Sequence, residues 1–158
     1  MKWTVILVGT VAASTVVAVA VFLGSVDQRS LSGRADPKDP QAVAMGERVY
    51  REHCAACHGT NLEGQPNWQM RRPDGRLPAP PHDESGHTWH HADEVLLRIT
   101  KEGVGALVPG YESDMPAYAD ILTDNEILAA LAFVKSRWPQ AIQARQADID
   151  RRTRQDGR

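Results

Sequence analysis

The segment from His53 to His58, "HCAACH", constrains the fold of this chain more than any other segment. It holds the only two cysteines among the 158 residues, Cys54 and Cys57, and His58 follows directly. A disulfide between residues three positions apart would close a very short ring and would stabilise the chain little. The motif is therefore best examined for what two neighbouring thiols and an imidazole can bind.

The rest of the chain carries helical patterns and no strand pattern. Residues 40–53 place apolar side chains on one helical face, and residues 92–102 begin with acidic side chains and stop before Gly103. Residues 123–126 form a capping box that leads into an apolar run ending at Trp138. No stretch alternates apolar and polar residues as a half-buried strand does. These patterns predict an all-α fold.

A long loop separates the first two predicted helices. Residues 59–88 are rich in proline and glycine and show no periodicity. A compact domain rarely keeps so long a loop unless something holds it in place. Aromatic residues make up only 6% of the chain, which predicts a thin core of the kind that leans on a cofactor. Both observations favour a cofactor at the centre of the domain.

Three kinds of site fit Cys54, Cys57 and His58. A redox dithiol of the thioredoxin type needs a βαβ context, and the sequence gives no sign of strands. A structural zinc site needs four ligands, and the other histidines lie at no recognised spacing. The pattern C-x-x-C-H is that of covalent haem attachment, in which the two thiols bind the porphyrin vinyl groups and the histidine binds iron. This third interpretation is favoured.

Haem iron in electron-transfer proteins commonly takes methionine as its sixth ligand. Met115 is the best candidate, because it precedes the last predicted helix and is followed by the rigid Pro116. Met45 lies on the first helix and Met70 in the long loop, and both are poorer candidates. Several histidines remain alternatives, either as the sixth ligand or as a site for a metal such as copper. They are His82, His87, His90 and His91.

With these motifs in order, residues 40 to 139 resemble the class I cytochromes c. Gly46 and Tyr50 resemble the glycine and the aromatic residue of the first helix in that family, and Phe133 resembles the aromatic residue of its last helix. The resemblance implies a cytochrome c-like domain packed around one covalently bound haem c. It assigns Cys54 and Cys57 to the thioethers and His58 and Met115 to the iron.

Three details of the resemblance stay open. The family commonly has a proline whose carbonyl oxygen supports the proximal histidine, and here Pro78, Pro80 and Pro81 all qualify. Trp89 is either a propionate donor or an anchor of its loop. Three arginines either pair with the propionates or are solvated charges of the loop. They are Arg71, Arg72 and Arg76.

The N-terminal segment predicts export from the cytoplasm. Residues 3–23 carry no charge over 21 positions, which is long enough to cross a bilayer and longer than a typical signal-peptide core. An uncleaved membrane anchor over 1–23 is favoured over a cleaved signal peptide. Residues 24–40 read as a flexible linker, 41–139 as the haem domain and 140–158 as a charged tail without assigned function. The haem domain is expected on the periplasmic side of the cytoplasmic membrane.

The predicted function is one-electron transfer by a membrane-tethered, mono-haem cytochrome in a bacterial respiratory chain. Redox proteins, such as a terminal oxidase or a dehydrogenase, are the expected partners, and the chain is not expected to be an enzyme by itself. The net charge of −2 argues against a nucleic-acid partner. The alternatives are a fixed haem subunit of a larger complex, a haem-based sensor and a metal-handling module.

Overall fold

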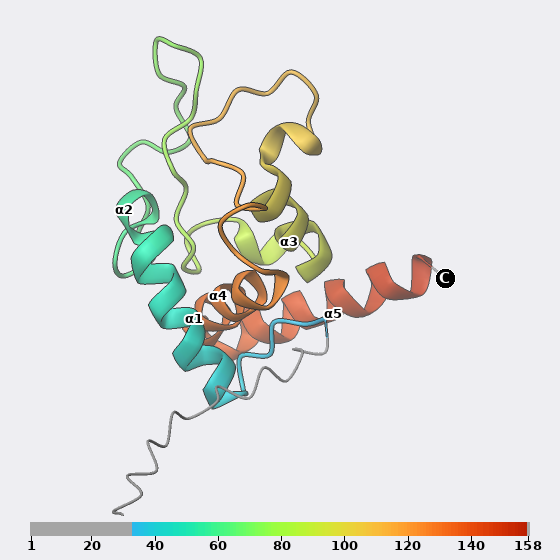
Figure 1. Cartoon of the computed structure of the whole chain (residues 1–158). Coiled ribbons are helices and arrows are strands. Elements are labelled where there is room, and N and C mark those ends of the chain that lie inside the picture. Colours follow the sequence, from blue (N-terminus) through green and yellow to red (C-terminus); the bar gives the residue numbers. More distant parts are fainter. Residues whose placement is uncertain (1–32, 158) are drawn as a thin grey trace, which may run out of the picture.

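The computed structural model describes residues 33–157 and is all-α (Figure 1), as the sequence predicts. No β-strand occurs in this range. The helices are α1 (Pro40–His53), α2 (Ala55–His58), α3 (Asp93–Glu102), α4 (Asp124–Ser136) and α5 (Gln140–Asp156), with short 3₁₀ turns η1 (Thr88–His90) and η2 (Val104–Ala106). Within 33–157 no helix has the length and apolarity to span a bilayer. The apolar run at 3–23 lies outside the described residues.

The two largest elements of the core begin at well-defined caps. The Asp39 carboxylate accepts the first free backbone N–H groups of α1, and Pro40 occupies the position where no N–H is needed. At α4, Thr123 and Glu126 form the capping box that the sequence predicts. The caps define the first residues of α1 and α4, and the apolar faces of both helices follow directly.

Helices α1 and α4 cross at Gly46. A Cβ atom at this position would lie 1.8 Å from the backbone oxygen of Ala129, so the close approach of the two helices excludes any side chain. One turn further on, the rings of Tyr50 and Phe133 pack with their centroids 5.4 Å apart. These are the glycine and the aromatic pair on which the family resemblance rests. The crossing holds the end of α1, and with it the motif, against the core.

Two long segments, 59–87 and 107–123, close the remaining sides of the domain (Figure 1). The first folds back on itself, because the His82 N–H donates to the Leu62 carbonyl oxygen at 2.7 Å. Gly64 makes this return possible. It has a φ of +67°, and a Cβ there would lie 2.5 Å from the Pro81 nitrogen. The loop therefore passes close beside α2 instead of extending into solvent.

The C-terminal residues form helix α5, which is docked on the domain through a buried charge cluster. This cluster consists of Asp93, Lys135, Gln146 and Asp150. The Lys135 ammonium lies 2.8 Å from Asp93 and 3.6 Å from Asp150. The Asp150 carboxylate also accepts the backbone N–H of Asp93 at 2.7 Å, at the start of α3. The polar and charged sequence of 140–158 predicts a solvated helix or a frayed tail, whereas the structure turns Gln146 and Asp150 inward.

Candidate cofactor site

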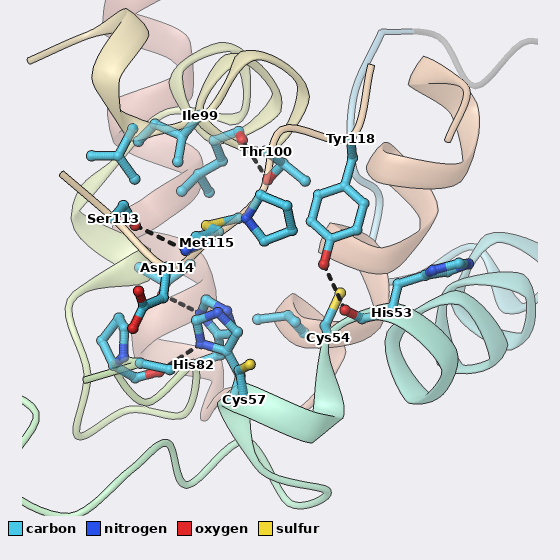
Figure 2. Close-up of a pocket in the computed structure, with 18 of the residues that line it drawn as sticks. His53, Cys54, Cys57, His82, Ile99, Thr100, Ser113, Asp114, Met115 and Tyr118 are labelled. Atoms are coloured by element: carbon cyan, nitrogen blue, oxygen red, sulfur yellow. Dashed lines mark hydrogen bonds between the residues drawn. The ribbon is translucent and has the colours of Figure 1, made fainter. Parts of the chain in front are cut away.

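A cavity of about 380 Å³ lies at the centre of the domain, between the α1–α2 junction, α3, α4 and the two long segments. The four side chains that the sequence analysis singles out, Cys54, Cys57, His58 and Met115, all line it. Figure 2 shows the two cysteines on one wall and Met115 on another. The fold thus brings together residues that are up to about sixty positions apart in the chain.

The two cysteines are held by a break in the helix. Cys54 ends α1, and the single turn of α2 follows, in which the His58 N–H donates to the Cys54 carbonyl oxygen at 2.9 Å. Both thiols are free, Cys54 half-buried and Cys57 exposed. Burial, and then the neighbouring Cys57, raise the pKa of the Cys54 thiol to about 11. A redox dithiol needs a lowered thiol pKa, so this environment argues against thioredoxin-type chemistry.

His58 is buried and oriented by a single strong hydrogen bond. Its Nδ1 lies 2.8 Å from the carbonyl oxygen of Pro80. A carbonyl can only accept, so Nδ1 carries the proton and the lone pair of Nε2 is left for a metal. Burial lowers the pKa of the imidazole, although the bond to Pro80 opposes this, and a neutral ring is the form that binds iron. Of the three candidate prolines, Pro80 makes the contact.

Met115 comes from the segment between η2 and α4. It is half-buried against the core and is the only methionine within 33–157 that lines the cavity. Its backbone N–H donates to the Ser113 hydroxyl at 3.0 Å. Met45 packs against the core on α1, and Met70 is 66% exposed. Among the methionines at positions 45, 70 and 115, only Met115 therefore has its thioether at this cavity.

The histidine that lies closest to His58 belongs to the same wall of the cavity. The His82 ring stacks on the His58 ring with centroids 4.0 Å apart, and its Nδ1 lies 2.7 Å from the Thr88 hydroxyl oxygen. If His58 held an iron, a ring stacked on it would lie beside it and not on the opposite side of that iron. Sequence reasoning missed this contact, although the position of His82, two residues after Pro80, was a usable signal.

His87 and His91 also line the cavity, whereas His90 is exposed and does not. His87 stacks on Trp68 with parallel rings 5.7 Å apart, and His90 packs edge-on against Trp89. Between residues 33 and 157, no three side chains of the types His, Cys, Asp and Glu gather closely enough to hold a metal ion.

Two tyrosines brace the motif from outside it. The Tyr118 hydroxyl donates to the His53 carbonyl oxygen at 2.7 Å, and the Tyr50 hydroxyl donates to the Gly59 carbonyl oxygen at 2.9 Å. These bonds satisfy backbone oxygens at both ends of the CxxCH segment, where helical bonding stops. Tyr118 was not identified from the sequence, because its partner lies 65 residues away.

The residues of the cavity fit a haem, whose ring is apolar and whose propionate groups are acidic. Most of its lining is apolar, and the side chain of Arg72 reaches its rim. The Nε atom of Arg72 is buried and makes no hydrogen bond within the described part of the chain, so a donor is left for a propionate. Trp89 does not line the cavity and instead donates from its indole nitrogen to the Glu84 carbonyl oxygen at 3.3 Å, as a loop anchor.

Comparison with known proteins gives a consistent result. A family model described as Cytochrome c matches residues 43–138. The chain is 30% identical over 112 residues to the cbb3-type cytochrome c oxidase subunit CcoP of Azospirillum brasilense, covering 71% of this chain and 34% of that protein. It is 40% identical over 47 residues to thiosulfate dehydrogenase of Stutzerimonas stutzeri (strain A1501), covering 27% and 15%. The chain thus spans about a third or less of these relatives. No solved structure matches significantly.

Proposed function

The chain belongs to the cytochrome c family and its cofactor is covalently bound haem c, and from this we propose that it transfers single electrons through one haem. The observation that carries the proposal is the convergence of Cys54, Cys57, His58 and Met115 on one cavity. Two thiols followed by a histidine suit a covalent haem linkage, and a thioether at the same cavity supplies a sixth ligand.

Each residue has a distinct role in this proposal. Cys54 and Cys57 form the thioether bonds, the Nε2 atom of His58 binds iron, and the Met115 sulfur takes the sixth position. When bound, the haem supplies an iron that cycles between its ferric and ferrous states. The chain holds the ligands still, because Pro80 fixes the His58 ring and the core packs against Met115. A rigid ligand set limits reorganisation when the charge changes.

The exposed thiol indicates where electrons enter and leave. Cys57 lies at the protein surface, whereas Cys54 is half-buried. An attachment point at the surface leaves little protein between the cofactor and a docked partner. The near-neutral charge of the chain provides little long-range steering, so a partner has to be kept close by other means.

We further propose that the apolar segment 3–23 tethers the domain to the cytoplasmic membrane, with the haem on the periplasmic side, in a respiratory chain. The relatives carry the names of an oxidase subunit and a dehydrogenase, which supports a membrane oxidase or a dehydrogenase as partner. Affinity purification of the detergent-solubilised full-length protein should recover redox subunits. A stoichiometric set favours a fixed subunit, a substoichiometric set favours a tethered shuttle, and recovery of the cytochrome alone contradicts this choice of partner.

Met115→Ala tests the ligand assignment. We expect the ferric variant to lose the methionine–iron charge-transfer band and the reduction potential to fall, because thioether ligation favours the ferrous state. The reduced variant should also bind carbon monoxide readily. Optical titration measures all three quantities. Met70→Ala makes the same change at an exposed residue and should behave as the wild type. A band that survives Met115→Ala refutes the assignment, and rapid carbon monoxide binding by the wild type favours a sensor.

A further inference from the structure

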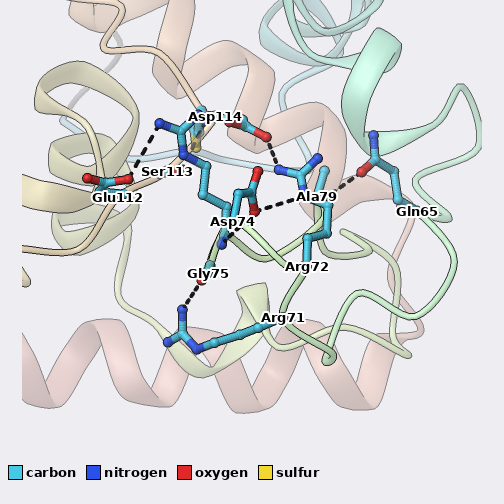
Figure 3. Close-up of polar contacts among 11 residues, drawn as sticks. Gln65, Arg71, Arg72, Asp74, Gly75, Ala79, Glu112, Ser113 and Asp114 are labelled. Atoms are coloured by element: carbon cyan, nitrogen blue, oxygen red, sulfur yellow. Dashed lines mark hydrogen bonds and ion pairs between the residues drawn. The ribbon is translucent and has the colours of Figure 1, made fainter.

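A turn of the long proline-rich loop lies against the segment that carries Met115 (Figure 3). The turn spans residues 71–76 and is closed by backbone bonds from Arg72 N–H to the Arg76 carbonyl oxygen, at 2.9 Å, and from Gly75 N–H to the Arg72 carbonyl oxygen, at 2.8 Å. Arg72 and Arg76 are therefore held in a fixed relation to each other.

Both arginines bind one carboxylate. Arg76 Nη1 lies 2.7 Å from Asp114 Oδ1, and Arg72 Nη2 donates to Asp114 Oδ2, so each oxygen takes one guanidinium. We call Arg72, Arg76 and Asp114 the arginine clamp. Hydrogen bonds from the two arginines lower the pKa of Asp114, which keeps its carboxylate ionised. The partners are 38 and 42 residues apart in sequence, so the clamp joins two loops that are distant along the chain.

Two weaker contacts support the clamp on either side. The Arg76 guanidinium also lies 3.5 Å from the Glu112 carboxylate. The Arg71 guanidinium lies over the Tyr111 ring at 5.5 Å, and is itself fixed by a 2.6 Å bond to the Gly75 carbonyl oxygen. The turn thus contacts the segment 111–114 at three residues.

Apart from the packing of Met115 against the core, the segment is held by few backbone hydrogen bonds. Among the described residues, no backbone N–H between positions 112 and 117 donates to a backbone carbonyl oxygen, until Tyr118 bonds to Thr100 at 3.1 Å. Segments with few backbone bonds open at low free-energy cost. Asp114 precedes Met115 directly, so its two ion pairs restrain the residue next to the thioether.

We propose that the arginine clamp positions Met115, so that Arg72, Arg76 and Asp114 act through Met115 to keep the sixth iron site closed. This proposal rests on the proposed assignment of Met115 as the sixth ligand. Single exposed ion pairs contribute little. Here two arginines of a preformed turn bind one carboxylate, and the preformed turn removes part of the ordering cost. Screening by salt should weaken the restraint, because the clamp lies at the surface.

The test is the affinity of ferric holo-protein for imidazole, which competes with the methionine. Asp114→Asn keeps the shape of the side chain and removes its charge, and we expect imidazole to bind about fivefold more tightly as two exposed pairs are lost. Glu47→Gln is the matched control, because it breaks the exposed Glu47–Arg51 pair on α1, away from the clamp. The control should bind imidazole as the wild type does.

Two further measurements make the result decisive. If the clamp acts as a unit, Arg76→Gln combined with Asp114→Asn should have the same affinity as Asp114→Asn alone. The thermal midpoint should hardly change, because only the loop is released. An unchanged affinity in Asp114→Asn beside a raised affinity in Met115→Ala overturns the clamp and leaves the ligand assignment standing. An unchanged affinity in Met115→Ala overturns both.

Discussion

Replacing both Cys54 and Cys57 by alanine is expected to leave a protein that carries no covalently attached haem and does not reach the native fold. The two thiols are the only ones in the chain, so no other thioether can form. The cavity of about 380 Å³ is bounded by α1, α3, α4 and both long segments, and its lining is mostly apolar. Without its cofactor the domain has a large void at the point where all these elements meet, which a small core cannot sustain.

Two measurements check this result. Haem-dependent peroxidase staining after denaturing electrophoresis reports covalent attachment, and far-ultraviolet circular dichroism reports helix content. Each single variant keeps one thioether and should retain haem at lower yield. Ala56→Ser changes the exposed residue between the cysteines and should leave attachment intact. A double variant with native helix content and a cooperative thermal transition would show that the chain folds without haem, contrary to this expectation.

The local patterns of the sequence predicted the helices well. The capping box at Thr123 and the glycine after Glu102 are signals that act within one turn, and the observed boundaries follow them closely. The motif at Cys54–His58 is likewise local, because the linkage needs two thiols and a histidine at fixed spacing. Gly46 was assigned to the helix crossing only through the family resemblance.

The supports of the site escaped sequence reasoning, because each joins residues far apart in the chain. Pro80 could not be chosen over its neighbours until the return of the loop 59–87 set the direction of its carbonyl. The stacking of His82, the bond from Tyr118 and the arginine clamp depend on the same loop path. Periodicity detects faces of helices, whereas these contacts are made by irregular segments whose course is fixed by packing.

The docking of the C-terminal helix α5 also could not be predicted from the sequence. Its sequence is rich in charges and carries little apolar periodicity, so nothing in it predicts a buried face. Its docking depends on Gln146 and Asp150, which find partners on α3 and α4. A polar contact of this kind can be recognised only when both partners have been placed in the structure. Because the contact is buried, a single substitution in the buried charge cluster should have a large effect on stability.

Lys135→Met is expected to destabilise the folded holo-protein by about 3–5 kcal/mol, the cost typical of removing one partner from a buried ion pair. Within residues 33–157, Lys135 is the one cation that pairs with the Asp93 and Asp150 carboxylates, and all three residues are buried. Methionine fills a similar volume and leaves both carboxylates without a cation. Lys101→Met is the matched control, because the Lys101–Asp124 pair is exposed, and it should cost less than about 1 kcal/mol. Denaturant unfolding of both variants measures the difference.

The pH dependence of that loss identifies its cause. Burial already raises the pKa of Asp150 in the wild-type protein, and removal of Lys135 should raise it further. A carboxyl whose folded-state pKa lies above its unfolded value destabilises the fold at neutral pH and is relieved as the pH falls through the folded-state value. The deficit of Lys135→Met relative to the wild type should therefore shrink on mild acidification. A deficit that is constant with pH would indicate lost packing, and a deficit no larger than that of Lys101→Met would show that the buried charge cluster contributes little to docking of α5.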